Sequence, residues 1–180
     1  MSDKLILDMW KTGPPPAKGQ FQRYPSRFWI NFARAYPGYI TYHKGGKVTV
    51  NDGIRVLHMF SGSIEWGDTT DIRPDSEASI IAPYDELPIP DCTYDLVVAD
   101  PPYADFFSKA WVKPSKFPIP KRILVEGARV TKPDGLTAIL HIIKIRNWKE
   151  ANTKWIGGHS ILCGDNNTVR FLNVFRKKEE

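Results

Sequence analysis

A chain of 180 residues, 42% of them hydrophobic, is long enough for one domain with a full core and too short for two domains of ordinary size. It has no apolar run of membrane-spanning length, and the acids and prolines of "MSDKLILDMWKTGPPP" are atypical of a signal peptide, so we expect an intracellular, cytoplasmic protein with no membrane partner. The cysteines, Cys92 and Cys163, lie far apart without metal-ligand spacing. We therefore expect neither a metal site nor a disulfide framework.

The net charge of +5 is unevenly distributed. Residues 1–50 carry eight Lys/Arg against two acids, and residues 111–180 carry fourteen against six. Residues 51–110 reverse the balance, with three basic residues against twelve acids. Basic flanks around an acidic centre suggest a surface for a polyanion beside a pocket for another ligand, although solvated faces of a mildly basic protein would show the same pattern.

The N-terminal part is expected to hold an arm, a helix and a hairpin. Residues 1–22 contain "KTGPPPAKG", which indicates an extended arm. Ser26 is expected to cap a helix over "RFWINFARAY", which has aromatic residues at every fourth position and ends at Pro37-Gly38. These aromatic residues are Phe28, Phe32 and Tyr36. The β-rich segments beside Gly45-Gly46 predict a hairpin.

From Ile54 onward, short apolar segments end at loops rich in Gly, Asp and Pro. The expected strands are "IRVLHMF", "TTDI", "ASIIA", "YDLVVA" and "LTAILHIIKI", with a helix in "IPKRILVEGARVTKPDG" that stops at Pro133 to Gly135. Two β-rich segments around Gly164 to Asn167 predict an antiparallel pair at the C-terminus. The predicted fold class is α/β, a Rossmann-like doubly wound sheet, mostly parallel with an antiparallel C-terminal hairpin and helices on both faces. Residues 23–180 would form this single domain.

The segment "VVADPPYADFF" carries the clearest chemical signal. If "YDLVVA" is a central strand, the tetrad Asp100 to Tyr103 lies at its carboxyl end, where such sheets bind ligands. The prolines stiffen the loop and lack N–H groups, so their carbonyls remain free as acceptors. Asp100 adds a second acceptor, and Tyr103 offers a ring on which a planar base can stack. This combination predicts a receptor for an exocyclic amine on a heterocycle.

The tetrad "DPPY", with "VLHMFSGS" upstream, resembles the amino-methyltransferases that modify adenine N6 or cytosine N4 in DNA with S-adenosylmethionine, and more broadly the class I methyltransferases. The resemblance covers roughly Tyr24 to Phe175. It implies that the catalytic residues are Asp100, Pro101, Pro102 and Tyr103, and that S-adenosylmethionine is the cofactor, which Asp100 also contacts.

The resemblance also implies a set of cofactor-binding residues at four motifs. "RYPSRF" would close over the methionine carboxylate, "MFSGS" would approach the methionine part, "TTDIRP" would bind the ribose hydroxyls, and "IAPYDELP" would contact the adenine ring. "EGARVTKPDG" resembles the helix and turn after the catalytic strand. The implied residues are Tyr24, Pro25, Phe60, Ser61, Gly62, Ser63, Asp71, Ile72, Tyr84 and Asp85.

Three features depart from the family pattern. Ser63 replaces the second glycine of the FxGxG loop, and Pro83 stands where an acid is expected unless Asp85 takes its place. Only ten residues separate Phe60 from Asp71, too few for a multi-turn crossover helix. Either that helix is reduced to a loop, or these strands pair in a different way.

The function expected from these residues is methyl transfer to a nucleobase amino group, with DNA adenine N6 preferred. An RNA methyltransferase acting on guanine N2 or adenine N6 is the alternative enzyme, and a catalytically silent methyltransferase-like scaffold is the alternative of another class. The chain has little room for a separate target-recognition domain. Target recognition would then be weak, or would come from a partner subunit or a homodimer.

Overall fold

The computed structural model describes residues 5–12, 24–60, 64–102, 118–163 and 168–179. The strands are β1 (Ile6–Thr12), β2 (Ile40–Tyr42), β3 (Val48–Val50), β4 (Val56–Met59), β5 (Asp68–Asp71), β6 (Ile80–Ile81), β7 (Tyr94–Ala99), β8 (Thr131–His141), β9 (Thr153–Cys163) and β10 (Thr168–Lys177). The helices are α1 (Phe28–Ala35), α3 (Pro120–Val130) and the 3-10 turn η1 (Lys149–Ala151). Among the described residues, no helix combines the length and apolar character of a membrane span.

Eight strands form one sheet in the order β1-β9-β10-β8-β7-β4-β5-β6. All neighbouring pairs are parallel except the two that involve β10, which runs antiparallel to both β8 and β9. From β4 the chain builds outward through β5 and β6 on one side, and then through β7 and β8 on the other. The switch point of this doubly wound sheet therefore lies between β4 and β7, as the expected α/β class requires.

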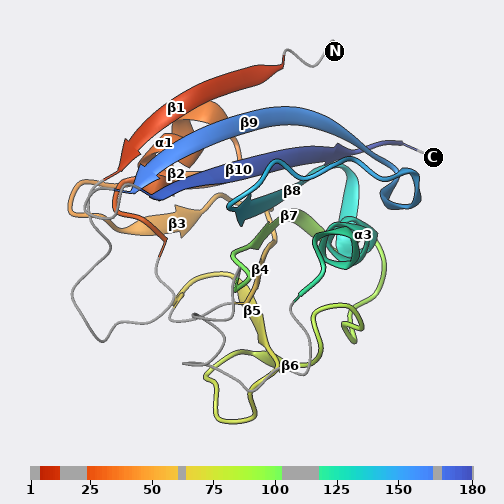
Figure 1. Ribbon diagram of the computed structural model, residues 1–180. Coiled ribbons are helices and arrows are strands. Elements are labelled where there is room, and N and C mark those ends of the chain that lie inside the picture. Colours follow the sequence, from red (N-terminus) through yellow and green to blue (C-terminus); the bar gives the residue numbers. More distant parts are fainter. Residues whose placement is uncertain (1–4, 13–23, 61–63, 103–117, 164–167, 180) are drawn as a thin grey trace.

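The sheet is covered on both faces, with one described α-helix on each (Figure 1). Side chains of β7 alternate between two clusters: Leu96 and Val98 pack in the cluster of α1, whereas Val97 and Ala99 pack in the cluster of α3. All four are fully buried. The uninterrupted apolar sequence of this strand is explained by this double burial, as predicted.

The β2–β3 hairpin and the antiparallel pair of β9 and β10 agree with the sequence prediction, although the turn at Gly164 to Asn167 lies outside the described residues. Part of the expected arm, residues 6–12, is extended and forms β1, which is paired in parallel with β9. This strand was not predicted. Its apolar residues alternate, and Trp10 is buried in the α1 cluster.

Two local predictions about the helices were wrong. Ser26 does not cap α1, because the helix starts after Arg27, whose φ is 65°. The Phe28 N–H donates a hydrogen bond to the Pro25 carbonyl at 3.0 Å. The helix α3 ends at Val130, before the predicted stop, and residues 132–135 bulge out of the β7–β8 ladder.

The strand expected over 136–145 ends at His141. Beyond it, the buried Asn173 side chain accepts a hydrogen bond from the Ile145 N–H at 2.7 Å and donates one to the Ile143 carbonyl at 3.2 Å. These bonds satisfy backbone groups of the loop that no strand pairs with, so the loop leaves the sheet at this point.

The core contains a histidine that should make the fold sensitive to acid. His58 of β4 is fully buried, and the rings of Trp29 and Trp66 meet it edge-on at 5.6 and 4.4 Å. Burial lowers the pKa of His58 to about 3, and burial likewise lowers the pKa of His159 to about 4. Both rings are therefore neutral in the folded protein at pH 7.

We predict that the free energy of unfolding has its full value above about pH 6.5 and decreases as the pH falls toward these lowered pKa values. Below about pH 6.5 the unfolded chain binds protons that the folded chain excludes. For His58 the slope is at most about 1.4 kcal/mol per pH unit. In urea titrations between pH 7 and pH 4, His58→Leu should reduce the slope, whereas His43→Gln, at an exposed position, should leave it unchanged. Equal slopes for both variants would contradict the prediction.

Candidate active site

The carboxyl ends of the parallel strands and the start of β10 meet at one edge of the sheet. There β4 ends at Met59, β5 ends at Asp71 and β7 ends at Ala99. Because β10 is antiparallel, its first residues lie at the same edge, so Arg170 faces the ends of the parallel strands. Side chains far apart in sequence are thereby assembled around the switch point.

Asp100 follows β7 directly and leads into the buried Pro101 and the half-buried Pro102, whereas Tyr103 lies outside the described residues. The Asp100 side chain is 12% exposed, and its Oδ2 accepts a hydrogen bond from the Arg170 Nη1 at 3.4 Å. This ion pair keeps a negative carboxylate at the end of the central strand. Sequence reasoning missed Arg170, although a charge within the apolar run "TVRFLNVF" was a usable signal.

Tyr24, expected at the cofactor, belongs to the same group. It is 7% exposed, and its ring packs against Phe28 and Trp29 at 4.6 and 4.7 Å. Burial raises the pKa of Tyr24 well above its usual value; the negative charge of Asp100 raises it further, and Arg170 opposes this. Tyr24 is therefore a neutral hydroxyl beside the ion pair at pH 7.

Tyr24 and the buried Pro25 also line a pocket of about 580 Å³. Its walls come from the start of α1, the β2–β3 hairpin and the residues before β5. The remaining lining residues are Ser26, Arg27, Phe28, Trp29, Tyr42, Gly46, Lys47, Val48, Ile64, Glu65 and Trp66. Five of the thirteen lining residues are aromatic, two are cationic and one is acidic, and the pocket adjoins the Asp100 end of the sheet through Tyr24.

Phe60 and Tyr84 bring the ends of β4 and β6 together. Phe60 has a φ of 61°, unusual for a residue with a side chain, and turns the chain sharply after β4. Its ring lies 5.4 Å from that of Tyr84, whose hydroxyl accepts a hydrogen bond from the Ile119 N–H at 3.0 Å. Asp85 accepts a hydrogen bond from the Arg122 Nη1 at 2.9 Å. The other expected residues of the first loop, Ser61, Gly62 and Ser63, lie outside the described residues.

The segment after Tyr84 is fastened to α3 through Arg129. The guanidinium donates to both carboxylate oxygens of Glu126, to the Leu87 and Ile89 carbonyls and to the Asp91 carboxylate, at 2.6 to 3.0 Å. These bonds, made mainly by Glu126, raise the pKa of Arg129. The loop that carries Tyr84 is thus positioned by a permanent cation.

Asp71 is buried at the end of β5 and already has a partner. Its carboxylate accepts the Arg73 backbone N–H at 2.9 Å, the Arg73 Nε at 3.2 Å and the Arg73 Nη2 at 3.1 Å. A carboxylate offers about four acceptor positions, so one remains at Oδ2. Sequence reasoning did not anticipate this competition from Arg73.

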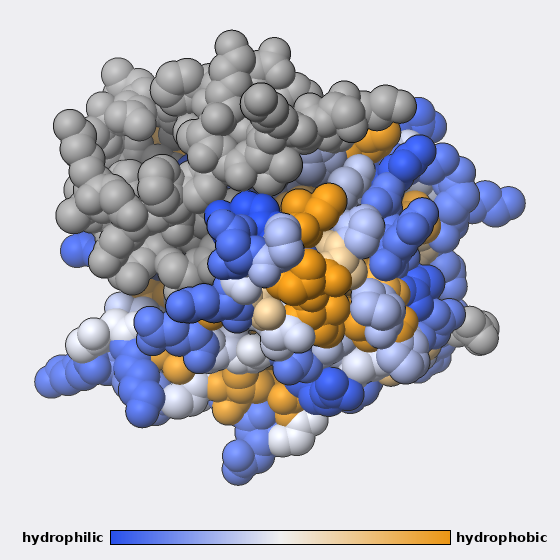
Figure 2. Space-filling model, turned by 90° about the horizontal axis from the view of Figure 1, so that it is seen from below, coloured by the Kyte–Doolittle hydropathy of each residue, from blue (hydrophilic) through white to orange (hydrophobic). Residues whose placement is uncertain are grey.

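The neighbour of Asp71, Ile72, is 56% exposed, and Ile81 of β6 is 46% exposed. Viewed from the β6 end of the molecule, apolar side chains gather in a patch between hydrophilic ones (Figure 2). An exposed apolar side chain next to a strand-end carboxylate suits a ring that carries hydroxyl groups at its edge. Within the described residues, no three His, Cys, Asp or Glu side chains cluster as a metal site would require.

No known protein family matches the sequence of this chain, and no curated protein does. Its structure, however, resembles solved methyltransferases. A chain from the complex of the Haloferax volcanii Trm112 methyltransferase activator with a methyltransferase has a TM-score of 0.51 at 16% identity, over 72% of this chain and 85% of that one.

Two further structures agree with this likeness. A SAM-dependent methyltransferase from Methanosarcina mazei has a TM-score of 0.50 at 11% identity, over 73% of this chain and 95% of that one. A methyltransferase from Bacillus halodurans has a TM-score of 0.50 at 10% identity, over 72% and 94%. The fold of this chain is therefore the Rossmann-like fold of class I methyltransferases.

We predict that Asp100 and Arg170 stabilise each other. Both side chains are mostly buried, so a double-mutant cycle with Asp100→Asn and Arg170→Met, measured by urea denaturation at pH 7, should give a coupling energy of about 1–2 kcal/mol. Arg55 and Asp68 provide the matched control, because their side chains are 55% and 44% exposed and pair at 3.2 Å. Their coupling should stay near 0.5 kcal/mol. Equal coupling in both pairs would contradict a structural role for Arg170.

Proposed function

We propose that this chain transfers a methyl group from S-adenosylmethionine to an exocyclic amino group of a nucleobase, with adenine N6 in DNA as the preferred target. The observation that carries the proposal is the position of Asp100-Pro101-Pro102, directly after the central strand β7 and beside the switch point. In a doubly wound sheet this is the place where ligands bind.

The residues at this edge suit an amine substrate. The Asp100 carboxylate can accept one amino hydrogen, and the Pro101 carbonyl can accept the other, because the following Pro102 leaves the segment without an N–H in between. Two such bonds would direct the nitrogen lone pair away from the loop. Arg170 donates to the Asp100 carboxylate at 3.4 Å and so holds it in place. Positioning and preorganised charge, rather than a strong base, would supply most of the rate enhancement.

S-adenosylmethionine would supply an electrophilic methyl group on a sulfonium, and the described residues fit its parts. Asp71 retains an acceptor position for a ribose hydroxyl, with the exposed Ile72 beside it. The paired rings of Phe60 and Tyr84 and the carboxylate of Asp85 lie near the ends of the neighbouring strands. Tyr24 belongs to the aromatic pocket next to Asp100.

A nucleic-acid substrate is supported by the charge of the connection between β8 and β9. This segment starts at the same edge of the sheet and runs to the beginning of β9 at the opposite edge, where Lys154 lies level with Arg176. Its first part, residues 142–149, carries the cations Lys144, Arg146 and Lys149 and no acid. A duplex would have to present its base flipped out of the stack to reach Asp100. The Haloferax volcanii structure is a complex of a methyltransferase with an activator, and this chain would likewise bind a partner subunit, here one that supplies target recognition.

A silent scaffold is the second candidate, and Arg73 favours it. Its guanidinium occupies most of the carboxylate that would bind the ribose. Within the described residues, the connections from β4 to β5 and from β5 to β6 contain no helix, unlike the usual crossovers of such sheets.

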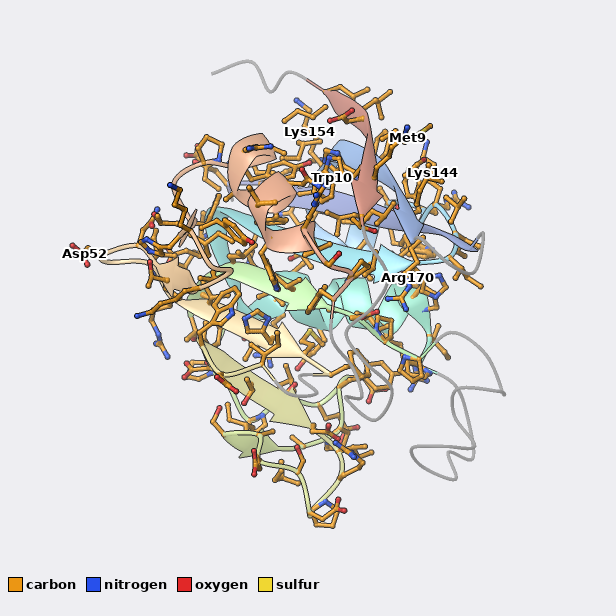
Figure 3. The ribbon with its side chains drawn as sticks, turned by 90° about the vertical axis from the view of Figure 1, so that its left-hand side faces the viewer. Met9, Trp10, Asp52, Lys144, Lys154 and Arg170 are labelled. Atoms are coloured by element: carbon orange, nitrogen blue, oxygen red, sulfur yellow. The ribbon has the colours of Figure 1, made fainter. Side chains whose placement is uncertain are left out.

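The central prediction concerns Asp100. Asp100→Ala should reduce methyl transfer by at least about a hundredfold, because one of two acceptors for the amine is lost. Binding of S-adenosylmethionine, measured by calorimetry, should be affected far less than transfer, because Asp100 is only one of the expected cofactor contacts. Asp52→Ala is the matched control, since Asp52 is exposed and lies on the other side of the molecule from Arg170 (Figure 3). Residual transfer combined with lost cofactor binding would contradict the role of Asp100 as an acceptor for the amine.

Labelled-methyl transfer to DNA and to RNA, followed by nucleoside analysis, identifies the substrate. Methyl label in N6-methyladenine from DNA is expected. Label only in RNA would move the assignment to the RNA enzyme, and no binding of S-adenosylmethionine up to about millimolar concentration would leave only the scaffold.

The ribose contact is tested separately. Asp71→Asn should weaken binding of S-adenosylmethionine by at least about tenfold, since a charged acceptor is lost. Arg73→Gln frees Oδ2 and should bind the cofactor as tightly as the wild type or more tightly. Calorimetry decides between these outcomes, with the thermal melt of each variant as the folding control. Weaker binding in Arg73→Gln would show that Arg73 supports the site instead of competing for it.

A further inference from the structure

The strand β1 is a long edge of the sheet. On one side it pairs with β9 over the whole range Ile6–Thr12, and on the other side no strand of the described chain pairs with it (Figure 1). The opposite edge, β6, has only two residues. A seven-residue edge exposes a row of backbone N–H and C=O groups that can bind another strand.

The two faces of β1 differ strongly. Trp10 and Thr12 are buried on the face toward α1, whereas Leu5, Leu7 and Met9 are 48%, 63% and 60% exposed on the opposite face. Figure 3 shows Met9 and Trp10 as neighbours on this strand. Successive side chains of a strand point to opposite faces, so the three exposed residues form one apolar row along the edge.

The apolar row is continuous with further exposed apolar surface. Lys11 pairs with Leu162 of β9, and Leu162 pairs with Val169 of β10, so all three lie on the face of Leu7 and Met9. Val169 is 46% exposed. Edge strands of soluble proteins usually carry charges or proline that discourage pairing, and this face of β1 has only Lys11 at its end.

We propose that β1 pairs with β1 of a second copy of this chain, antiparallel, about a twofold axis at Leu7. A twofold axis perpendicular to the sheet relates two identical edges in antiparallel orientation and closes the assembly as a dimer. In this register Leu7 lies opposite Leu7 of the other copy, and Leu5 lies opposite Met9. Every exposed apolar side chain of the row then meets an apolar partner across the strands.

Neighbouring registers fit less well. An axis at Asp8 would set two carboxylates against each other, and an axis at Met9 would set Leu7 against Lys11. With the axis at Leu7, Asp8 lies on the other face, opposite Ile6. Its carboxylate accepts the Met9 N–H at 2.7 Å, and on pairing this bond would be exchanged for one to the Leu5 carbonyl of the other copy.

The contact is smaller than a standard protein interface, so we expect a dissociation constant in the micromolar range. The antiparallel pairing would join the two sheets into one continuous sheet. The two candidate active sites would then lie at opposite ends of its strands, because the strands of the two copies run in opposite directions. Each site would keep its own residues. A failure of the dimer proposal would therefore not contradict methyl transfer, and a failure of methyl transfer would not contradict the dimer.

Disulfide trapping tests the register. In a chain with Cys92→Ser and Cys163→Ser, Leu7→Cys places two cysteines opposite each other, with Cα atoms at about 5.5 Å, within the range of a disulfide. Mild oxidation should yield a cross-linked dimer on non-reducing gels. Met9→Cys is the matched control, since Leu5 lies opposite it, and its cross-linked fraction should be at least about tenfold lower. Equal cross-linking at both positions would overturn the register.

Sedimentation velocity tests the dimer itself. The wild-type chain should shift from monomer to dimer between about 1 and 200 μM, and Leu7→Lys should remain monomeric over this range. Ile81→Lys, at a 46% exposed position on the β6 edge, should dimerise like the wild type. A wild-type chain that stays monomeric, or a dimer that survives Leu7→Lys, overturns the proposal. Because Leu7 is mostly exposed, both lysine variants should keep the wild-type circular dichroism spectrum.

Discussion

The double burial of the central strand β7 is the constraint on which the rest of the structure depends. Leu96 and Val98 fill one hydrophobic cluster, and Val97 and Ala99 fill the other, so the strand can neither slip by a residue nor rotate without exposing apolar surface. This locks the point at which the strand ends. Asp100, as the next residue, is therefore held at the rim of the sheet, and its position is a consequence of the packing beneath it.

The reversed direction of β10 has a similar effect on the chemistry of that rim. Parallel strands alone would bring only their carboxyl ends together, but the antiparallel strand adds residues from its beginning. Arg170 thus reaches the Asp100 carboxylate, and Asn173, three residues further along β10, holds the loop after β8 through hydrogen bonds. One strand supplies both a positive charge for the site and the polar anchor of a neighbouring loop.

The connections between β4, β5 and β6 are short and cover little of the sheet. Where usual crossovers contain helices, the described segments between β4, β5 and β6 are turns held by polar contacts, such as those of Asp71 with Arg73. The loop after β6 is fastened by Arg129 and Glu126 instead of by a large apolar surface. With less cover, the apolar side chain of Ile72 stays exposed beside the candidate site.

The α/β class, the strand β7 with its terminal aspartate and the β2–β3 hairpin could be predicted from the sequence, because they depend on local apolar runs and turn residues. It also indicated Tyr24, Phe60, Asp71 and Tyr84 as candidates. The contacts of these side chains, by contrast, depend on the folded chain. The pairing of Arg170 with Asp100, the hold of Arg73 on Asp71, and the place of β1 at the sheet edge depend on which strands become neighbours. That order is set by the packing of the whole core, which no local pattern encodes.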